Sequence, residues 1–144
     1  MEILTKVLHP DAVLPAYANE GDAGCDLVAV ETCTLAPGGG REMVGTGLSI
    51  AIPPGYGGFV LPRSGLAAKY GVTCINAPGL IDAGYRGEVR VAMVNLDPAN
   101  EYVVHKGDRI AQLVVLPVPE ALFAVVDELP SASRGEGGFG SSGR

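Results

Sequence analysis

The chain has 144 residues, of which 47% are hydrophobic and 18% are charged, a composition that indicates one globular domain and excludes a disordered chain. Its formal net charge of −6 excludes a general attraction to nucleic acid or to anionic membranes, so an anionic ligand needs a local basic cluster or a cation. No apolar run is long enough to span a bilayer, and the first ten residues lack the pattern of a signal peptide. Three cysteines in no disulfide or zinc pattern add to the expectation of a cytoplasmic protein.

Short apolar runs between turn signals predict β-strands along most of the chain. The 21 glycines and 11 prolines mark the turns. Within residues 88–95, Val89, Val91 and Met93 alternate with Glu88 and Arg90, which predicts a strand with one buried face. In chain order, the expected strands cover residues 3–8, 47–52, 56–62, 88–95, 109–118 and 121–126.

One short helix is expected in the segment SGLAAKYG, residues 64–71. Ser64 can cap its N-terminus, and Gly71 can take the left-handed position that ends it. The predicted fold class is therefore all-β, a distorted jelly roll or β-barrel with one short helix. After Pro130 the chain turns rich in glycine and serine, so we expect a barrel domain over residues 1–130 and a flexible arm over residues 131–144.

Two segments in the first half of the chain carry candidate chemistry. In AGCDL, residues 23–27, Asp26 either satisfies turn N–H groups or lies near a metal ion. In PRSGLA, residues 62–67, Arg63, Ser64 and Gly65 form either an ordinary helix start or a phosphate site.

A third segment, INAPGLIDAGYRGE, residues 75–88, predicts a bent hairpin. The bend would leave backbone groups free to pair with the edge of a flat polar ring. Asp82 follows two apolar residues and is either a turn aspartate or a base, and Tyr85 either packs or covers something planar.

Two further segments complete the set. In GDRIAQL, residues 107–113, Asp108 and Arg109 can form an ion pair, and Gln112 faces either a site or solvent. The tail RGEGGFGSSGR, residues 134–144, has by itself the composition of a disordered end.

The order and spacing of these five segments resemble those of the dUTPase (dUTP diphosphatase) family, in its homotrimeric all-β class. The matching segments span residues 23–143, nearly the whole chain. The resemblance implies a jelly-roll subunit and a homotrimer whose active sites are shared between subunits. It implies hydrolysis of dUTP to dUMP and pyrophosphate with Mg²⁺ as cofactor, which limits uracil in DNA and supplies dUMP for dTMP synthesis.

The resemblance also implies a role for each candidate residue. Asp82 would activate the water that attacks the α-phosphate, with Gln112 placing groups, and Asp26 would reach Mg²⁺ through water while the triphosphate holds most of the ion. Tyr85 would pack on the sugar and exclude a 2′-hydroxyl, and Arg90 would contact the nucleotide through its backbone. The tail would be a mobile lid over the site. Phosphate contacts are implied for Arg63, Ser64, Gly65, Arg134, Gly138, Gly140 and Ser141, uracil contacts for Asn76, Gly79, Leu80 and Ile81, and a stack on uracil for Phe139.

Three other readings of the sequence stay open. A dCTP deaminase shares the expected fold but needs a different acid–base set near the helix. A regulatory module that binds nucleotides without catalysis has no need of Asp82. A structural jelly-roll protein has no need of the arginine and phenylalanine in the tail.

Overall fold

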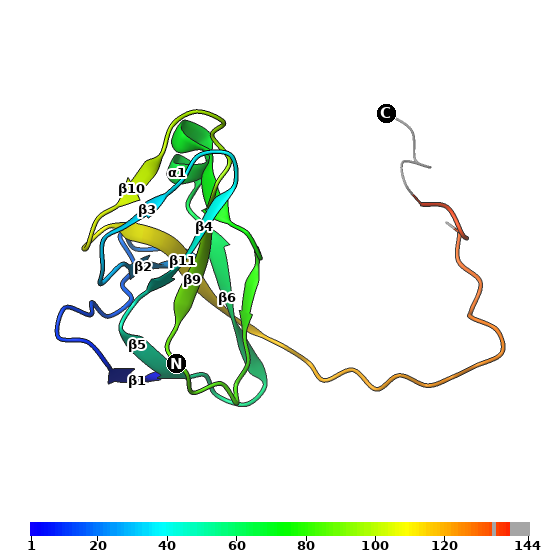
Figure 1. Ribbon diagram of the computed structural model, residues 1–144. Helices are drawn as coiled ribbons and strands as arrows, with labels where there is room; N and C mark the ends of the chain where they lie inside the picture. Colours follow the sequence, from blue (N-terminus) through cyan, green and yellow to red (C-terminus); the bar gives the residue numbers. More distant parts are fainter. Residues whose placement is uncertain (134, 139–144) are drawn as a thin grey trace.

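The computed structural model describes residues 1–133 and 135–138. Figure 1 shows a body built almost wholly of strands, from which the C-terminal segment departs. This confirms the predicted all-β class with one short helix. The elements are β1 (Leu4–Val7), β2 (Cys25–Val28), β3 (Cys33–Leu35), β4 (Gly40–Gly45), β5 (Leu48–Ala51), β6 (Tyr56–Pro62), α1 (Ser64–Tyr70), β7 (Val72–Cys74), β8 (Gly79–Ile81), β9 (Arg90–Asn95), β10 (Tyr102–Val104) and β11 (Arg109–Pro117).

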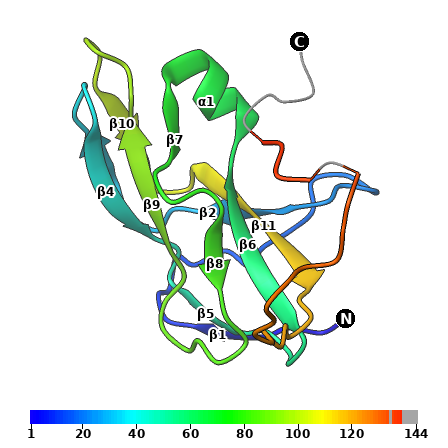
Figure 2. The ribbon, with the colours of Figure 1, turned by 90° about the vertical axis from the view of Figure 1, so that its right-hand side faces the viewer.

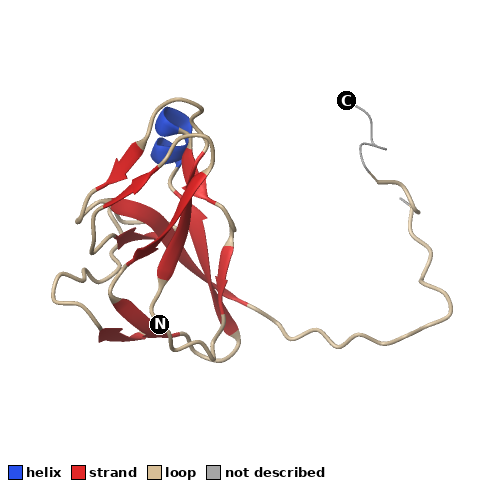
Figure 3. Cartoon of the chain, viewed as in Figure 1, coloured by secondary structure: helices blue, strands red, loops and turns tan. Residues whose placement is uncertain are grey.

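Two larger sheets and two strand pairs build the body. One sheet has the strand order β2-β11-β6-β8 and the other has the order β4-β9-β7, while β1 pairs with β5 and β3 with β10. All the pairings are antiparallel, and neighbouring strands are mostly distant in sequence, as the colours of Figure 2 show. Figure 3 shows the strands in red and helix α1 in blue. Such long-range pairing is typical of a jelly roll.

The core lies between these sheets. Strand β9 places Val91 and Met93 inside, as the alternating sequence predicted, and strands β2 and β11 contribute Leu27 and Leu113 from the other sheet. Cys74 is also buried there as a free thiol, and burial raises its pKa to about 11. Because the thiolate is the reactive form, this cysteine is inert at neutral pH.

The N-cap of helix α1 lies one residue earlier than predicted. Arg63, in extended conformation, occupies the N-cap position without a side-chain hydrogen bond, and Ser64 is already helical. The prediction that Ser64 caps the helix is therefore wrong, because the extended conformation ends at Arg63 and the first helical turn already includes Ser64. Gly71 ends the helix at φ 66° and donates its N–H to Ala67, as expected of a left-handed C-terminal glycine.

The third segment is not a hairpin. Strands β7 and β8 flank residues 75–78 but do not pair with each other, since β7 pairs with β9 and β8 pairs with β6. The segment therefore passes from one sheet to the other. Strand β8 is the last strand of its sheet, so its outer edge still presents unpaired backbone groups.

The predicted strand at residues 121–126 is absent from the described chain. Residues 118–133 contain no helix or strand, and Leu122, Phe123 and Val125 are 97%, 92% and 102% exposed. A valine-rich sequence forms a strand only where an edge is available to pair with it, and this segment runs away from the body (Figure 1). The division at residue 130 stays a prediction. None of the helices in the described residues is both long and apolar enough to cross a membrane.

The buried side chain of Asn95 allows a test of how its hydrogen bonds stabilise the fold. Its side chain is fully buried, donates to the carbonyls of Leu35 (3.1 Å) and Asn100 (2.8 Å), and accepts the N–H of Asp97 (3.0 Å). Asn95→Ala leaves these groups unpaired and should lower the free energy of unfolding by about 2–3 kcal/mol in denaturant titration. Asn100→Ala, which keeps its backbone carbonyl, should change it by no more than about 0.5 kcal/mol; equal losses would contradict the role of Asn95.

Candidate active site

One pocket collects most of the residues predicted from the third segment. It has a volume of about 290 Å³ and is lined by Met43, Leu80, Ile81, Asp82, Tyr85, Glu88, Val89 and Arg90. Asp82 is exposed just beyond the end of β8, where a carboxylate remains accessible to water and ligand. The pocket therefore combines an available base with the free edge of a strand.

Asn76 stands at the start of this edge. A Cβ added at Gly79 would lie 3.2 Å from the Asn76 amide nitrogen and 3.3 Å from the Cβ of Val60. Glycine at position 79 therefore lets the side chain of Asn76 lie close against the strand. An amide side chain and a free backbone edge can together recognise a ring that carries alternating donors and acceptors.

Tyr85 is held by its own turn. Its hydroxyl donates to the carbonyl of Glu88 at 2.9 Å. Its ring lies against Gly87, where an added Cβ would sit 2.7 Å from the ring Cζ. The ring is half exposed at the pocket wall, so it offers a flat apolar surface to a ligand.

A second pocket, of about 300 Å³, gathers the residues expected to bind phosphate. Arg63, Ser64 and Gly65 line it together with Gln112. Gln112 lies at the middle of β11, opposite Asp26 of β2 and Leu61 of β6. The structure thus brings the second and fourth segments together in one chain, in a different pocket from Asp82 and Tyr85.

Asp26 lies beside this second pocket as the ion-pair partner of two arginines. Its carboxylate is nearly buried and lies 3.3 Å from the Nε of Arg63 and 3.1 Å from the Nη1 of Arg109. Arg63 also donates to the carbonyl of Arg109 at 3.3 Å. Two guanidinium groups are therefore held at one place on an acidic protein.

The pairing of Arg109 corrects an expectation. Arg109 pairs with Asp26 and not with its neighbour Asp108, whose carboxylate accepts the N–H of His105 (2.9 Å) and closes the turn. Sequence adjacency suggested the Asp108 pair, but the register of β2 against β11 decided the partner. The sequence analysis therefore missed Arg109 as part of a basic cluster.

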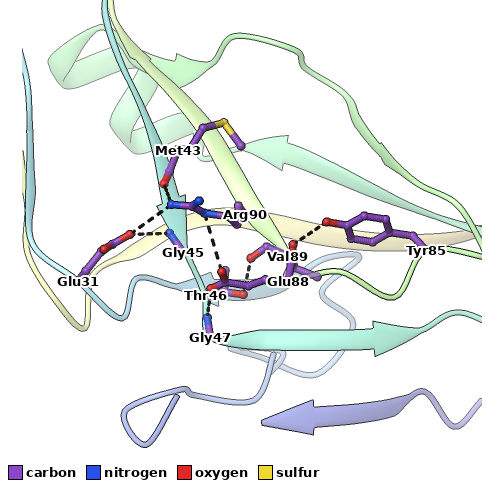
Figure 4. A network of polar contacts seen from close by, with 9 residues as sticks. All are labelled: Glu31, Met43, Gly45, Thr46, Gly47, Tyr85, Glu88, Val89 and Arg90. Atoms are coloured by element: carbon purple, nitrogen blue, oxygen red, sulfur yellow. Dashed lines mark hydrogen bonds and ion pairs between the residues drawn. The ribbon is translucent and has the colours of Figure 1, made fainter. Parts of the chain in front are cut away.

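The side chain of Arg90 belongs to a polar network at the rim of the first pocket. Figure 4 shows its guanidinium between two glutamates, at 3.8 Å from Glu31 and 3.9 Å from Glu88, while it donates to the carbonyl of Met43 at 2.6 Å. The sequence analysis did not include Glu31 or Glu88 among the site residues. Glu31 is far from Arg90 in the sequence, so the sequence gives no sign of this contact.

The tail contributes little that the structure describes. Gly138 is exposed, and Arg134, Phe139, Gly140 and Ser141 lie outside the described residues. In the part of the chain that is described, no group of three or more histidine, cysteine, aspartate or glutamate side chains could hold a metal ion.

Comparison with known proteins places the chain among nucleotide hydrolases. The family model described as dUTPase matches residues 11–143. Deoxyuridine 5'-triphosphate nucleotidohydrolase of Leifsonia xyli is 59% identical over 130 residues, which cover 90% of this chain and 85% of that protein. The enzyme of the same name from Thermobifida fusca is 57% identical over 136 residues, covering 94% and 75%.

Solved structures agree with these sequences. Staphylococcus bacteriophage 80alpha dUTPase with dUPNHPP superposes with a TM-score of 0.90 at 31% identity, covering 99% of each chain. A mutant dUTPase from phage phi11 of S. aureus, described for its coordination of a structural Mg(II) ion, has a TM-score of 0.80 at 26% identity, covering 91% of this chain and 100% of that one. The chain described here therefore belongs to the dUTPase family.

Proposed function

We propose that this protein is a dUTP diphosphatase, which hydrolyses dUTP to dUMP and pyrophosphate. The observation that carries the proposal is the first pocket, which sets Asp82 and Tyr85 beside the free edge of β8 in a chain of this family. The function would account for the sequence pattern as well, because each of the five segments would then supply one part of a nucleotide site.

The uracil ring would lie against β8. Backbone groups of Gly79, Leu80 and Ile81 on its outer edge, with the amide of Asn76, would pair with the ring. Cytosine reverses the donor and acceptor at its 4-position and would leave these groups unpaired, which is a strong basis for discrimination. Close approach of the backbone would also leave no room for the 5-methyl group of thymine.

Asp82 would accept a proton from the water that attacks the α-phosphorus. The new bond joins the water oxygen to phosphorus, the bond to the bridging oxygen breaks, and pyrophosphate leaves with its electron pair. Phosphoryl transfer needs positioning and charge neutralisation more than covalent chemistry from the protein. Gln112 would help to place groups, while Arg63, Ser64 and Gly65 would bind phosphate oxygens from the second pocket.

Mg²⁺ fits this scheme as an ion held chiefly by the triphosphate. The described residues include no cluster of carboxylates to bind it directly, and Asp26 already pairs with Arg63 and Arg109. The Oδ1 atom of Asp26 has no hydrogen-bond partner in the described chain. If phosphate draws Arg63 away, this oxygen would be able to accept a hydrogen bond from a metal-bound water. When bound, the ion would neutralise part of the phosphate charge.

The site would be completed in a homotrimer. Asp82 and Tyr85 line one pocket of the chain, whereas Arg63 and Gln112 line another. A second subunit that faces the first pocket with its own second pocket would unite the two halves. The exposed apolar segment 118–129 supports assembly too, because contiguous exposed apolar side chains mark a surface that associates.

Substrate comparison tests the function. Pyrophosphate release should be rapid with dUTP and low with dTTP, dCTP and UTP, because each of these changes a group that the pocket would read. The assay follows pyrophosphate with each nucleotide in the presence of Mg²⁺. Ammonia released from dCTP would instead identify a deaminase, and binding without any turnover would indicate a regulatory module.

Removal of the proposed base tests the mechanism. Asp82→Asn keeps the size of the side chain but removes its basicity, so turnover of dUTP should fall by roughly two or more orders of magnitude while dUTP binding is largely kept. Turnover is measured by pyrophosphate release and binding by calorimetry. Asp22→Asn, which makes the same charge change in an exposed turn, should leave both unchanged; near-normal turnover in Asp82→Asn would assign the base elsewhere.

Assembly is tested through the exposed segment. Light scattering of the unmodified protein should give three times 14.7 kDa, or 44.1 kDa. Phe123→Asp places a charge where an apolar side chain would be buried between subunits, so it should shift the protein toward smaller species and lower activity together. Ser131→Asp adds the same charge outside the apolar segment and should leave the trimer intact. A stable and active monomer would refute the shared site.

A further inference from the structure

We propose that Glu31, Arg90 and Glu88 form a positioning network that holds Tyr85 and thereby sets the selectivity for deoxyribonucleotides. The proposal rests on the function proposed above, in which Tyr85 faces the sugar. It adds the side chains of Glu31, Arg90 and Glu88, which would act through the position of Tyr85 and not through contacts of their own with the substrate. Figure 4 shows the network linking the 45–47 turn, the start of β9 and the ring of Tyr85.

The position of Tyr85 depends on the backbone of residues 87 and 88. Its hydroxyl donates to the Glu88 carbonyl at 2.9 Å. The ring contacts Gly87 so closely that an added Cβ would lie 2.7 Å from Cζ and still nearer to the hydroxyl oxygen. A shift of this short stretch of backbone would therefore move the ring.

The side chain of Glu88 is hydrogen-bonded to the 45–47 turn. Its Oε1 accepts the N–H of Gly47 at 2.8 Å. The next residue, Val89, is held on the same side, since its carbonyl accepts the Thr46 hydroxyl at 2.6 Å and its N–H donates to the Leu48 carbonyl at 2.7 Å. The backbone that carries the acceptor for Tyr85 is thus fixed against residues 46–48.

Arg90 connects this turn to a third segment. Its Nη2 donates to the Met43 carbonyl at 2.6 Å and lies 3.8 Å from Glu31 Oε1, and its Nε lies 3.9 Å from Glu88 Oε2. Glu31 Oε1 also accepts the N–H of Gly45 at 3.1 Å. Both carboxylates therefore contact backbone N–H groups of one turn, and one guanidinium lies between them and offsets part of their charge.

Gly45 shows how closely the two glutamates share this turn. A Cβ at position 45 would lie 2.7 Å from Glu88 Oε1 and 3.4 Å from Glu31 Oε1. Any larger residue would push the carboxylates off the turn. The arrangement therefore depends on glycine at this position for its close packing.

The solvent exposure of these side chains indicates that they position Tyr85 and contribute little to stability. The side chains of Arg90 and Glu31 are 46% and 53% exposed, and ion pairs at such exposure add little to stability. Their loss should leave the melting temperature nearly unchanged. It should nevertheless release Glu88 and the ring of Tyr85, and a mobile ring no longer excludes a 2′-hydroxyl.

The test is the ratio of kcat/KM for dUTP to kcat/KM for UTP. Arg90→Met should lower this ratio by about fivefold, the effect of losing one ordinary hydrogen-bonding restraint. Glu31→Gln, which keeps an acceptor for Gly45, should lower it less, and Arg90→Lys should restore part of the loss. Arg41→Met is the matched control, because it removes the same charge from the adjacent strand β4, and it should leave the ratio unchanged.

A double-mutant cycle separates this role from a general effect on structure. Tyr85→Phe removes the hydroxyl through which the network acts, so adding Arg90→Met to it should lower the ratio little further. Fully additive losses, or an unchanged ratio in Arg90→Met, would overturn the proposal while leaving dUTP hydrolysis by the unmodified protein intact.

An NMR measurement that needs no enzymatic turnover tests the position of Tyr85 independently. In NMR spectra of protein with ring-labelled tyrosine, Arg90→Met should shift or broaden the Tyr85 signals, and Arg41→Met should not. Unchanged Tyr85 signals would overturn the proposal. Absence of dUTP hydrolysis by the unmodified protein would instead refute the proposed function.

Discussion

The pairing of β11 along both of its edges sets the geometry of the second pocket. Gln112 lies opposite Asp26 on one side and Leu61 on the other, while Ala111 and Leu113 are buried on either side of it. A slip of one residue would carry Gln112 into the core and bring apolar side chains to the pocket. The register shift between Arg109 and Ala111 buries Ile110 and Ala111 in succession and leaves Arg109 outside, against Asp26. Core packing therefore determines where these polar side chains meet.

The same cluster would let a protein of net charge −6 bind a polyanion. Arg63 and Arg109 converge on the nearly buried carboxylate of Asp26. That carboxylate holds two cations together without a ligand, at the cost of keeping one of its own oxygens without a hydrogen bond. In the proposed function a phosphate group would replace the carboxylate as the partner of Arg63, so local charge, and not overall charge, would decide the binding.

The two pockets of the subunit differ in how they are supported. Arg63, Ser64 and Gly65 follow directly from the end of β6, a strand held on both edges. Tyr85 instead lies in a loop with no strand partner, between β8 and β9. Its hydroxyl donates to the backbone carbonyl of Glu88. The side chains of Glu88 and Glu31 bind the 45–47 turn, and Arg90 pairs with both of them. A loop that faces a ligand needs such support if it is to discriminate between sugars that differ by one hydroxyl.

Local chemistry let the sequence predict strands β1, β5, β6, β9 and β11, the left-handed Gly71, the alternating face of β9 and the family to which the chain belongs. Those features depend on neighbouring residues or on motif order, which a sequence displays directly. Tertiary structure alone decided that β7 and β8 join different sheets, that Arg109 pairs with Asp26, and that Glu31 meets Arg90. It also left residues 121–126 without a partner edge, despite their strand-like sequence. The physical reason is the same in each case, because these contacts join segments far apart in the chain, and local propensity carries no information about which edges and charges the fold brings together.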